Sequence, residues 1–247
     1  LFSCVTLLLN NNTIIDAAVE KTDQIEKHCC FFRDRIFVQY ANVYSPEFII
    51  GSDIQRDLHL PTSLTLPIKK GEHFLEICCG TGVFSIFAAL DGAEKVVAID
   101  INPDAVENTI ENSKKHGISE KVTVLQGFMF SPLQKEQLFD VIFLNIPFLY
   151  RSCSDHLRTL DRRKLNFERE LLCCYLKEGK SHIKRSGRML LCYSTTRVEI
   201  EKMYQWAKEY GWEVSLLEEE SNLIYEDYSW GKENCINVGL YELRLME

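Results

Sequence analysis

The feature that most constrains this chain is an apolar run that passes through two glycines into a second apolar run, between residues 74 and 90. We expect residues 74–78 to form a buried strand and residues 83–90 to form a helix that is apolar on nearly every side. Gly80 and Gly82 lie in the turn between them, where the absence of a Cβ lets a ligand approach the main chain. The unpaired N–H groups of the helix N-terminus are expected to point at that ligand.

A second apolar strand, residues 96–100, ends in Asp100. An acid at this position commonly accepts hydrogen bonds from ribose hydroxyls, which predicts a nucleoside-containing cofactor on a doubly wound sheet. Ser85 stands where the dinucleotide fingerprint has its third glycine. Glu76, inside the first strand, would repel a pyrophosphate but attract a cationic, amino-bearing ligand. The sequence therefore favours a cationic nucleoside cofactor, and a dinucleotide dehydrogenase is the less favoured alternative.

The pattern Glu-x-Cys-x-Gly-Thr-Gly at residues 76–82, followed by the acid at residue 100, resembles motif I and the next acidic position of the class I S-adenosylmethionine-dependent methyltransferases. The resemblance implies S-adenosylmethionine as the cofactor. The cofactor-binding residues that it implies are Glu76, Cys78, Gly80, Thr81, Gly82, Asp100, Ile101, Gly127, Phe128 and Asn145.

The remaining elements complete an α/β pattern in which strands alternate with helices, so we expect a Rossmann-like, mostly parallel sheet with helices on both faces. Two successive strands at the end predict an antiparallel edge hairpin and bring the total to seven strands. The further strands are expected at residues 122–125, 139–144, 188–193, 212–217 and 235–243, and the further helices at 103–116, within 155–184 and at 197–210. Within the helix after Asp100, Ala105, Val106 and Ile110 are expected to form the apolar stripe. In the helix at residues 197–210, the side chains expected to face the core are Ile200, Met203, Tyr204 and Ala207.

Two domains are predicted: residues 1–42 as a small N-terminal cap, and residues 43–247 as the methyltransferase domain. In the cap we expect a helix at residues 14–29 and a strand at 33–40. The cap packs on the main domain or, alternatively, helps to select the substrate. Because the chain starts at Leu1 and not at a methionine, we expect a trimmed chain or a fragment.

Composition narrows the partners and the compartment. A hydrophobic share of 46% with 26% charged residues is typical of a soluble globular protein, and a net charge of −8 argues against a broad electrostatic grip on nucleic acid. The ten cysteines show no C-x-x-C spacing, so no metal site is predicted, and we interpret them as reduced residues of a cytoplasmic protein rather than as disulfides. No stretch is long enough to span a membrane, so no membrane partner is expected.

Asn145, Ile146, Pro147 and Phe148 end the strand at residues 139–144, at the edge where open α/β sheets bind ligands. They resemble the Asn-Pro-Pro-Tyr/Phe motif of class I enzymes that methylate a nitrogen on a planar group, either a glutamine side chain or an exocyclic nucleobase amine. Residues 126–133 resemble the Gly-Asp-Leu-Phe-x-Pro-Leu segment of release-factor glutamine methyltransferases. The resemblance therefore implies that the nearest branch acts on protein glutamine.

The chemistry of such a motif follows from the poor nucleophilicity of an amide or aryl-amine nitrogen. The Asn145 side-chain oxygen and the Ile146 carbonyl would accept the nitrogen's N–H bonds and stabilise its growing positive charge, while Phe148 would stack on the planar group. No metal or strong base is needed. Ile146 departs from the family's first proline, and Phe128 stands where the family often has an acid that contacts the adenine amino group.

The prediction is therefore an S-adenosylmethionine-dependent N-methyltransferase that acts on a planar nitrogen, with a protein glutamine as the leading acceptor. The alternatives are a nucleobase amine of RNA or DNA, a small-molecule amine or amide, and a non-catalytic binding module with a methyltransferase fold. Residues 145–148 are alternatively an ordinary strand-ending turn. The basic stretch at residues 151–164 is either a guide for an acidic partner or a solvated surface.

Overall fold

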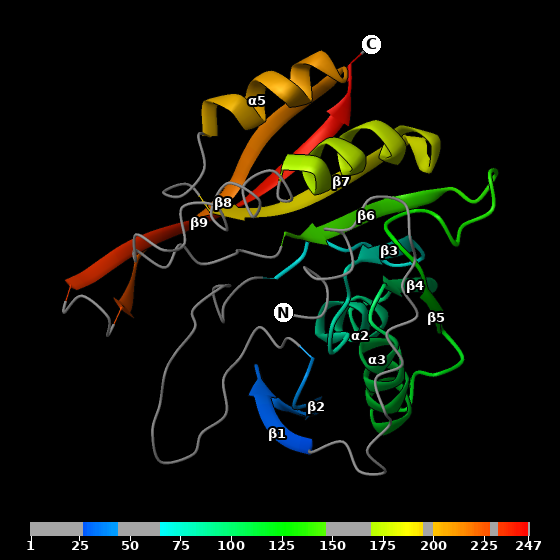
Figure 1. Cartoon of the computed structure of the whole chain (residues 1–247). Helices are drawn as coiled ribbons and strands as arrows, with labels where there is room; N and C mark the ends of the chain where they lie inside the picture. The colour runs from blue at the N-terminus through cyan, green and yellow to red at the C-terminus, as the bar shows by residue number, and fades with distance from the viewer. Residues whose placement is uncertain (1–26, 44–64, 147–168, 195–199, 228–231, 247) are drawn as a thin grey trace, which may run out of the picture.

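The computed structural model describes residues 27–43, 65–146, 169–194, 200–227 and 232–246 (Figure 1). These residues form a two-stranded hairpin and a seven-stranded sheet with the strand order β5-β4-β3-β6-β7-β9-β8. The first five strands of that order run parallel, and β9 and β8 complete the sheet with antiparallel pairing. The predicted seven-stranded, mostly parallel sheet with an antiparallel edge is confirmed.

The strands of this sheet are His73–Ile77 (β3), Lys95–Asp100 (β4), Val122–Gln126 (β5), Phe139–Asn145 (β6), Ile183–Ser194 (β7), Trp212–Asp227 (β8) and Lys232–Leu245 (β9). The helices are Val83–Leu90 (α2), Pro103–Lys115 (α3) and Ile200–Glu209 (α5), with residues 169–178 also helical and a 3₁₀ turn at Gly179–Ser181. Figure 1 shows α2 and α3 on one face of the sheet, and α5 with the helix at residues 169–178 on the other.

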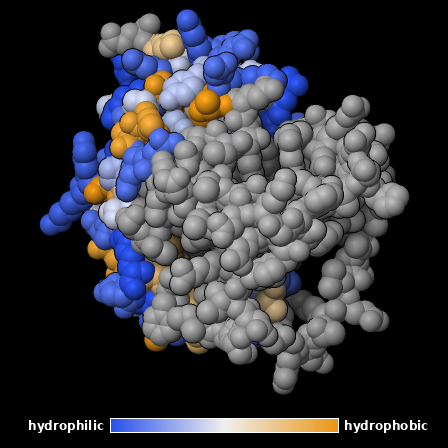
Figure 2. All heavy atoms as spheres, turned by 90° about the vertical axis from the view of Figure 1, so that its left-hand side faces the viewer, coloured by the Kyte–Doolittle hydropathy of each residue, from blue (hydrophilic) through white to orange (hydrophobic). Residues whose placement is uncertain are grey.

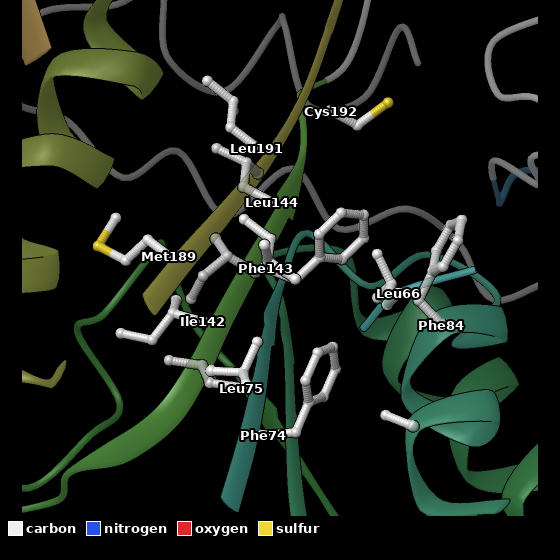
Figure 3. Packing of buried hydrophobic residues seen from close by; sticks show 14 of the residues in the cluster. Leu66, Phe74, Leu75, Phe84, Ile142, Phe143, Leu144, Met189, Leu191 and Cys192 are labelled. Atoms are coloured by element: carbon white, nitrogen blue, oxygen red, sulfur yellow. The ribbon is translucent and has the colours of Figure 1, made fainter. Parts of the chain in front are cut away.

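The centre of the molecule is packed with aromatic side chains between the sheet and α2. The rings of Phe84 on α2 and Phe143 on β6 have centroids 4.9 Å apart, and Phe74 on β3 stacks on Phe143 at 6.5 Å (Figure 3). Ile142 of β6 and Met189 of β7 lie on the opposite face of the sheet. Since both faces are covered, these strands are mostly apolar on both sides rather than alternating.

The helix after β4 has the termini that its sequence predicts. The Asn102 side chain accepts a hydrogen bond from the Asp104 N–H at 3.0 Å, and Pro103 takes the first helical position. Lys114 and Lys115 lie in the last turn, where they complement the helix dipole. Gly117 follows with a φ of 69°, the left-handed conformation that ends many helices.

The buried face of α3 differs from the expected one. Ala105 is buried, but Val106 and Ile110 are only partly buried. The fully buried positions are instead polar, and they are Asn108, Thr109, Asn112 and Ser113. The predicted apolar stripe is therefore wrong in two of its three members, because polar side chains at the other positions find hydrogen-bond partners inside the fold.

The N-terminal hairpin consists of Lys27–Phe32 (β1) and Arg35–Tyr40 (β2), which pair antiparallel. The strand at residues 33–40 is thus confirmed over most of its length, but the helix expected to reach residue 29 is wrong from residue 27 onward, and its earlier part lies outside the described residues. Cys30 and Phe32 are buried at every second position, which is the period of a strand. Phe32 packs edge-on against Phe84, with centroids 5.7 Å apart. The domain boundary at residue 42 stays a prediction.

Three other expectations need correction. Ile183 and Lys184 belong to β7 and not to the preceding helical stretch, because Ile183 pairs with Phe139 of β6. Strands β8 and β9 extend well beyond the predicted ends and pair as far as Asp227 with Lys232. Tyr204 was expected in the core but is 39% exposed.

On the described surface, the large exposed hydrophobic side chains are scattered, and the face in Figure 2 is mostly hydrophilic where it is coloured, with separate small apolar areas. Within the described ranges, no helix is both long and apolar enough to cross a membrane.

Candidate cofactor site

The carboxyl ends of the parallel strands meet at one edge of the sheet, and the predicted site residues gather there. Strand β3 ends at Ile77 and continues into residues 78–82, which we call the glycine loop. The neighbouring strands end at Asp100, Gln126 and Asn145. This edge is where open α/β sheets bind their ligands.

The glycine loop has an unusual main-chain conformation that α3 holds in place. Cys78, Gly80 and Gly82 have φ angles of 59°, 54° and 76°, all in the left-handed region. A Cβ at Gly82 would lie 2.5 Å from Cγ2 of Thr109, so only glycine fits under α3. The Thr109 hydroxyl donates a hydrogen bond to the Gly80 carbonyl at 2.9 Å. Packing against α3 thus accounts for the glycine at residue 82, and the close approach of a ligand to this main chain stays a prediction.

Asp100 binds the glycine loop from the end of β4. Its Oδ2 accepts a hydrogen bond from the Gly80 N–H at 2.9 Å, and its Oδ1 accepts one from the Asn102 N–H at 2.9 Å. Burial raises the pKa of Asp100, and these N–H bonds oppose that rise. Each carboxylate oxygen has a second lone pair, so the predicted bonds to ribose hydroxyls remain available. The next residue, Ile101, is half-buried, and its carbonyl accepts a bond from Gln126 Nε2 at 3.4 Å.

Glu76 is buried beneath the loop and is bonded to the first turn of α2. Its Oε2 accepts hydrogen bonds from both the N–H and the hydroxyl of Ser85, at 2.8 and 2.5 Å. Burial and, to a smaller extent, the nearby Asp100 carboxylate raise the pKa of Glu76 to about 8, against the lowering effect of the two bonds from Ser85. The expectation that the N–H groups of this helix end point at the ligand is wrong for Ser85, since Glu76 already accepts its N–H.

This arrangement decides which charge the site accommodates. The main-chain amides of Gly80 and Ser85, which a pyrophosphate would need, already donate to the carboxylates of Asp100 and Glu76. The Asp100 carboxylate, and Glu76 once it has lost its proton, disfavour a phosphate and favour a cation. S-Adenosylmethionine carries a positive sulfonium, an ammonium group and a ribose, so the residues present fit it better than they fit a dinucleotide.

At the end of β6, Asn145 pairs in register with Cys192 of β7. Its Oδ1 atom is buried and accepts no hydrogen bond from any residue that the structure describes. Ile146 is anchored, because its side chain is 1% exposed in the main core and its N–H donates to the Cys192 carbonyl at 3.4 Å. Pro147 and Phe148 lie outside the described residues, as does the basic stretch at 151–164.

The remaining predicted cofactor residues border the same edge. Thr81 is buried, and its hydroxyl has no hydrogen-bond partner among the described residues. Gly127 begins a tight turn in which an added Cβ would lie 2.8 Å from Cδ of Pro132. Phe128 is 37% exposed, and its N–H donates to the Ser131 hydroxyl at 3.1 Å. Gly127 is bound to β4, because its N–H donates to the Asp100 carbonyl at 2.9 Å.

Sequence reasoning missed three residues that shape the loop. Ser85 appeared only as a departure from the dinucleotide fingerprint, although it is the partner of Glu76. Thr109 and Asn112 were passed over because they are polar residues within a helix, yet both bond to carbonyls of the glycine loop. The available signal was their spacing, since polar residues at positions i, i+1 and i+4 (108, 109 and 112) share one face of a helix.

A family model described as a methyltransferase domain matches residues 68–234. The chain belongs to this methyltransferase domain family. Membership confirms S-adenosylmethionine as the cofactor and favours it over the dinucleotide of the dehydrogenase alternative. Among the described residues of this methyltransferase domain, no group of three or more His, Cys, Asp or Glu side chains is arranged to hold a metal ion.

Relatives of this methyltransferase domain include a Methanocaldococcus jannaschii protein named "Putative protein N5-glutamine methyltransferase". The two sequences are 32% identical over 139 residues, which cover 53% of this chain and 66% of that protein. A protein named ribosomal protein L11 methyltransferase, from Oceanobacillus iheyensis, is 38% identical over 117 residues, or 44% and 36% of the two chains. The match thus spans less than two thirds of either relative's length. In fold, the chain is similar to a crystal structure of a methyltransferase from Pyrococcus furiosus, with a TM-score of 0.51, 16% identity and coverage of 72% and 78%.

Proposed function

We propose that this chain transfers the methyl group of S-adenosylmethionine to a planar nitrogen, and that the acceptor is the side-chain amide of a protein glutamine. The observation that carries the proposal is the Asn145 side-chain oxygen, which is buried at the ligand-binding edge with no hydrogen-bond partner among the described residues. A buried acceptor without a hydrogen-bond donor costs free energy. A substrate N–H that donates to Asn145 would remove this cost.

Different residues would contact the cofactor and the acceptor. Asp100 and the glycine loop would hold the ribose, and Glu76, whose raised pKa keeps it protonated before binding, would lose its proton to the solvent and carry a negative charge beneath the cationic part of the cofactor. The cofactor, when bound, supplies a methyl group that its positive sulfur has already made electrophilic. Asn145 would accept an N–H bond of the acceptor amide and so stabilise the positive charge that develops on its nitrogen.

Protein glutamine is favoured over the other planar nitrogens by two sequence similarities. The segment at residues 126–133 resembles that of release-factor glutamine methyltransferases, and the M. jannaschii relative carries the N5-glutamine name. The net charge of −8 also disfavours an extended nucleic-acid partner. Ile146 keeps the main-chain carbonyl that would serve as the second acceptor, and its buried side chain anchors the residue in the core.

The test is methyl transfer from labelled S-adenosylmethionine to three acceptor sets: peptides with a central glutamine, the same peptides with asparagine, and oligonucleotides of mixed sequence. We expect label in the glutamine peptides only, because asparagine is one methylene shorter and would not bring its nitrogen to the cofactor. Transfer to oligonucleotides alone would overturn the glutamine assignment and leave the nitrogen chemistry standing.

Asn145→Ala tests the role of the acceptor oxygen. We expect transfer to fall by at least about 100-fold, the usual loss when a hydrogen bond to developing charge is removed, with cofactor affinity changed by less than about threefold. Cys192→Ala, at the paired position on β7, is the control that alters the same edge without the carboxamide. Equal turnover in Asn145→Ala and wild type would contradict the proposed role, and cofactor binding without transfer to any acceptor would favour the non-catalytic binding module.

A further inference from the structure

Asn112 of α3 is fully buried, and its side chain forms three hydrogen bonds. Its Oδ1 accepts the Val38 N–H at 2.8 Å, and its Nδ2 donates to the Val38 carbonyl at 2.8 Å. The second hydrogen of Nδ2 is directed to the Thr81 carbonyl in the glycine loop, at 3.0 Å. One carboxamide thus joins strand β2 of the N-terminal hairpin to the loop that binds the cofactor.

These three bonds fix the orientation of the carboxamide. A rotated amide would place its oxygen against the Val38 and Thr81 carbonyls and its NH₂ group against the Val38 N–H, so that all three contacts would become repulsive. The Asn112 side chain therefore has one stable position. Nδ2 has two hydrogens, and it donates one to the hairpin and the other to the glycine loop. A displacement of β2 would therefore also move the donor of the hydrogen bond to the Thr81 carbonyl.

Asn108, one turn earlier on the same helix, provides a natural comparison. Its Oδ1 accepts the Tyr40 N–H at 3.0 Å, and its Nδ2 donates to the Val38 carbonyl at 2.8 Å. Asn108 is as fully buried as Asn112 and binds the same strand, but its hydrogen bonds with the described residues do not reach the glycine loop. The two asparagines therefore differ in the hydrogen bond to the Thr81 carbonyl of the glycine loop, which only Asn112 of the two donates.

We propose that Asn112 is a positioning residue for cofactor binding, and that through it the β1–β2 hairpin forms part of the scaffold of the cofactor site. Thr81 is buried in the loop between Gly80 and Gly82, both of which have left-handed φ angles, and its carbonyl accepts the hydrogen bond from Asn112. Loss of its donor leaves a buried carbonyl unsatisfied, and rotation of the Thr81–Gly82 peptide to find another partner would displace the loop. The inference rests on S-adenosylmethionine as the cofactor and is independent of the acceptor.

The first experiment compares Asn112→Ala with Asn108→Ala in the whole 247-residue chain, by calorimetric titration with S-adenosylmethionine and by thermal unfolding. Both variants should lower Tm, because each loses two bonds to β2, and Asn112→Ala should lower it further because the bond to the Thr81 carbonyl is also lost. Only Asn112→Ala should weaken cofactor binding, by about tenfold or more, with Asn108→Ala within about threefold of wild type. Equal loss of affinity in both variants, or unchanged affinity in Asn112→Ala, would overturn the positioning role.

A second measurement needs no variant and serves even if Asn112→Ala does not fold. In wild type, the Val38 amide hydrogen is bonded to Asn112 and the Tyr40 amide hydrogen to Asn108. Addition of S-adenosylmethionine should slow hydrogen exchange at Val38 more than at Tyr40, because the cofactor immobilises the loop to which Asn112 is bound. Equal slowing at the two amides would contradict the proposal, and failure of wild type to bind the cofactor would overturn the cofactor assignment together with it.

Discussion

Ser85 donates both its main-chain N–H and its hydroxyl to a single carboxylate oxygen of Glu76, across the start of α2. Glu76 thereby holds the helix N-terminus while lying in a fully buried position, with Asp100 as a second carboxylate nearby. Because the carboxyl group is buried, its pKa is raised to about 8. This raised pKa should affect both the stability of the fold and the binding of the cofactor.

Replacement of Glu76 by Gln should change how stability depends on pH. The pKa of Glu76 is about 8 in the fold against 4.5 for the unperturbed group, so between these values the folded protein keeps a proton that the unfolded chain has lost. The contribution of Glu76 to stability therefore falls as pH rises through this window. Urea unfolding at pH 5.5, 6.5 and 7.5 should show Glu76→Gln gaining stability relative to wild type at each step. A constant difference across the three pH values would contradict the raised pKa.

Cofactor binding should be coupled to loss of the Glu76 proton. A cationic ligand favours the carboxylate form, so binding should tighten as pH rises toward about 8 and should release a proton below that pH. Calorimetry at pH 7 in two buffers of different ionisation enthalpy measures the release directly. We expect Glu76→Gln to bind more weakly and to release no proton, and an unchanged proton release in this variant would assign the linkage to another group.

Asp100→Ala should weaken S-adenosylmethionine binding by at least tenfold, about 1.4 kcal/mol, because both the predicted ribose acceptor and the partner of the Gly80 N–H are lost. Asp91→Ala is the control, since Asp91 forms an ion pair with Arg33 at 3.5 Å and no described contact with the glycine loop. Wild type is also titrated with NADH. A preference for NADH in wild type would reverse the choice between the two cofactor classes.

Cys78→Gly should stabilise the protein relative to Cys78→Ala. Cys78 has a φ of 59°, and this left-handed conformation costs a residue with a Cβ roughly 1–2 kcal/mol that glycine avoids. The greater flexibility of glycine in the unfolded chain offsets part of the gain, roughly 0.5–1 kcal/mol. A net difference of about 1 kcal/mol in the free energy of unfolding is expected from urea titration. Greater stability of the alanine variant would show that the loop relaxes without glycine.

Phe128→Asp should restore the acid that the family often has at this position and strengthen cofactor binding. The residue is 37% exposed, so a carboxylate there stays solvated until it meets the adenine amino group. Phe128→Ala separates the loss of the ring from the gain of the acid. We expect the Asp variant to bind S-adenosylmethionine at least about threefold more tightly than the Ala variant, in line with the modest worth of one exposed hydrogen bond. Identical affinities would place residue 128 away from the adenine.

The cofactor edge could be predicted from the sequence because its parts are close along the chain. Glu76 and the glycine loop are separated by a few residues, and the strand that ends at Asp100 follows within one helix. Apolar strands of a parallel sheet carry their own signal, and their carboxyl ends define the edge. The order of elements was therefore enough to bring Asp100 and the loop together.

The buried face of α3 could not be predicted in the same way. Asn112 bonds to Thr81, 31 residues away, and to Val38, 74 residues away. An amide is buried only if such partners exist, and helical periodicity contains no information about them, so the pattern favoured Val106 and Ile110 instead. The same applies to β1, since the strand that pairs with it and the aromatic rings beneath it decide its conformation.

Strand β8 forms one edge of the sheet, with its inner side paired to β9. Along it, Leu216 and Leu217 are exposed, and Glu213, Glu218 and Glu219 are exposed around them. If a second copy added its own β8 to this edge, several glutamates would lie close to glutamates of the other copy, and like charges across paired strands are destabilising. We therefore expect these carboxylates to disfavour edge-to-edge pairing of two copies.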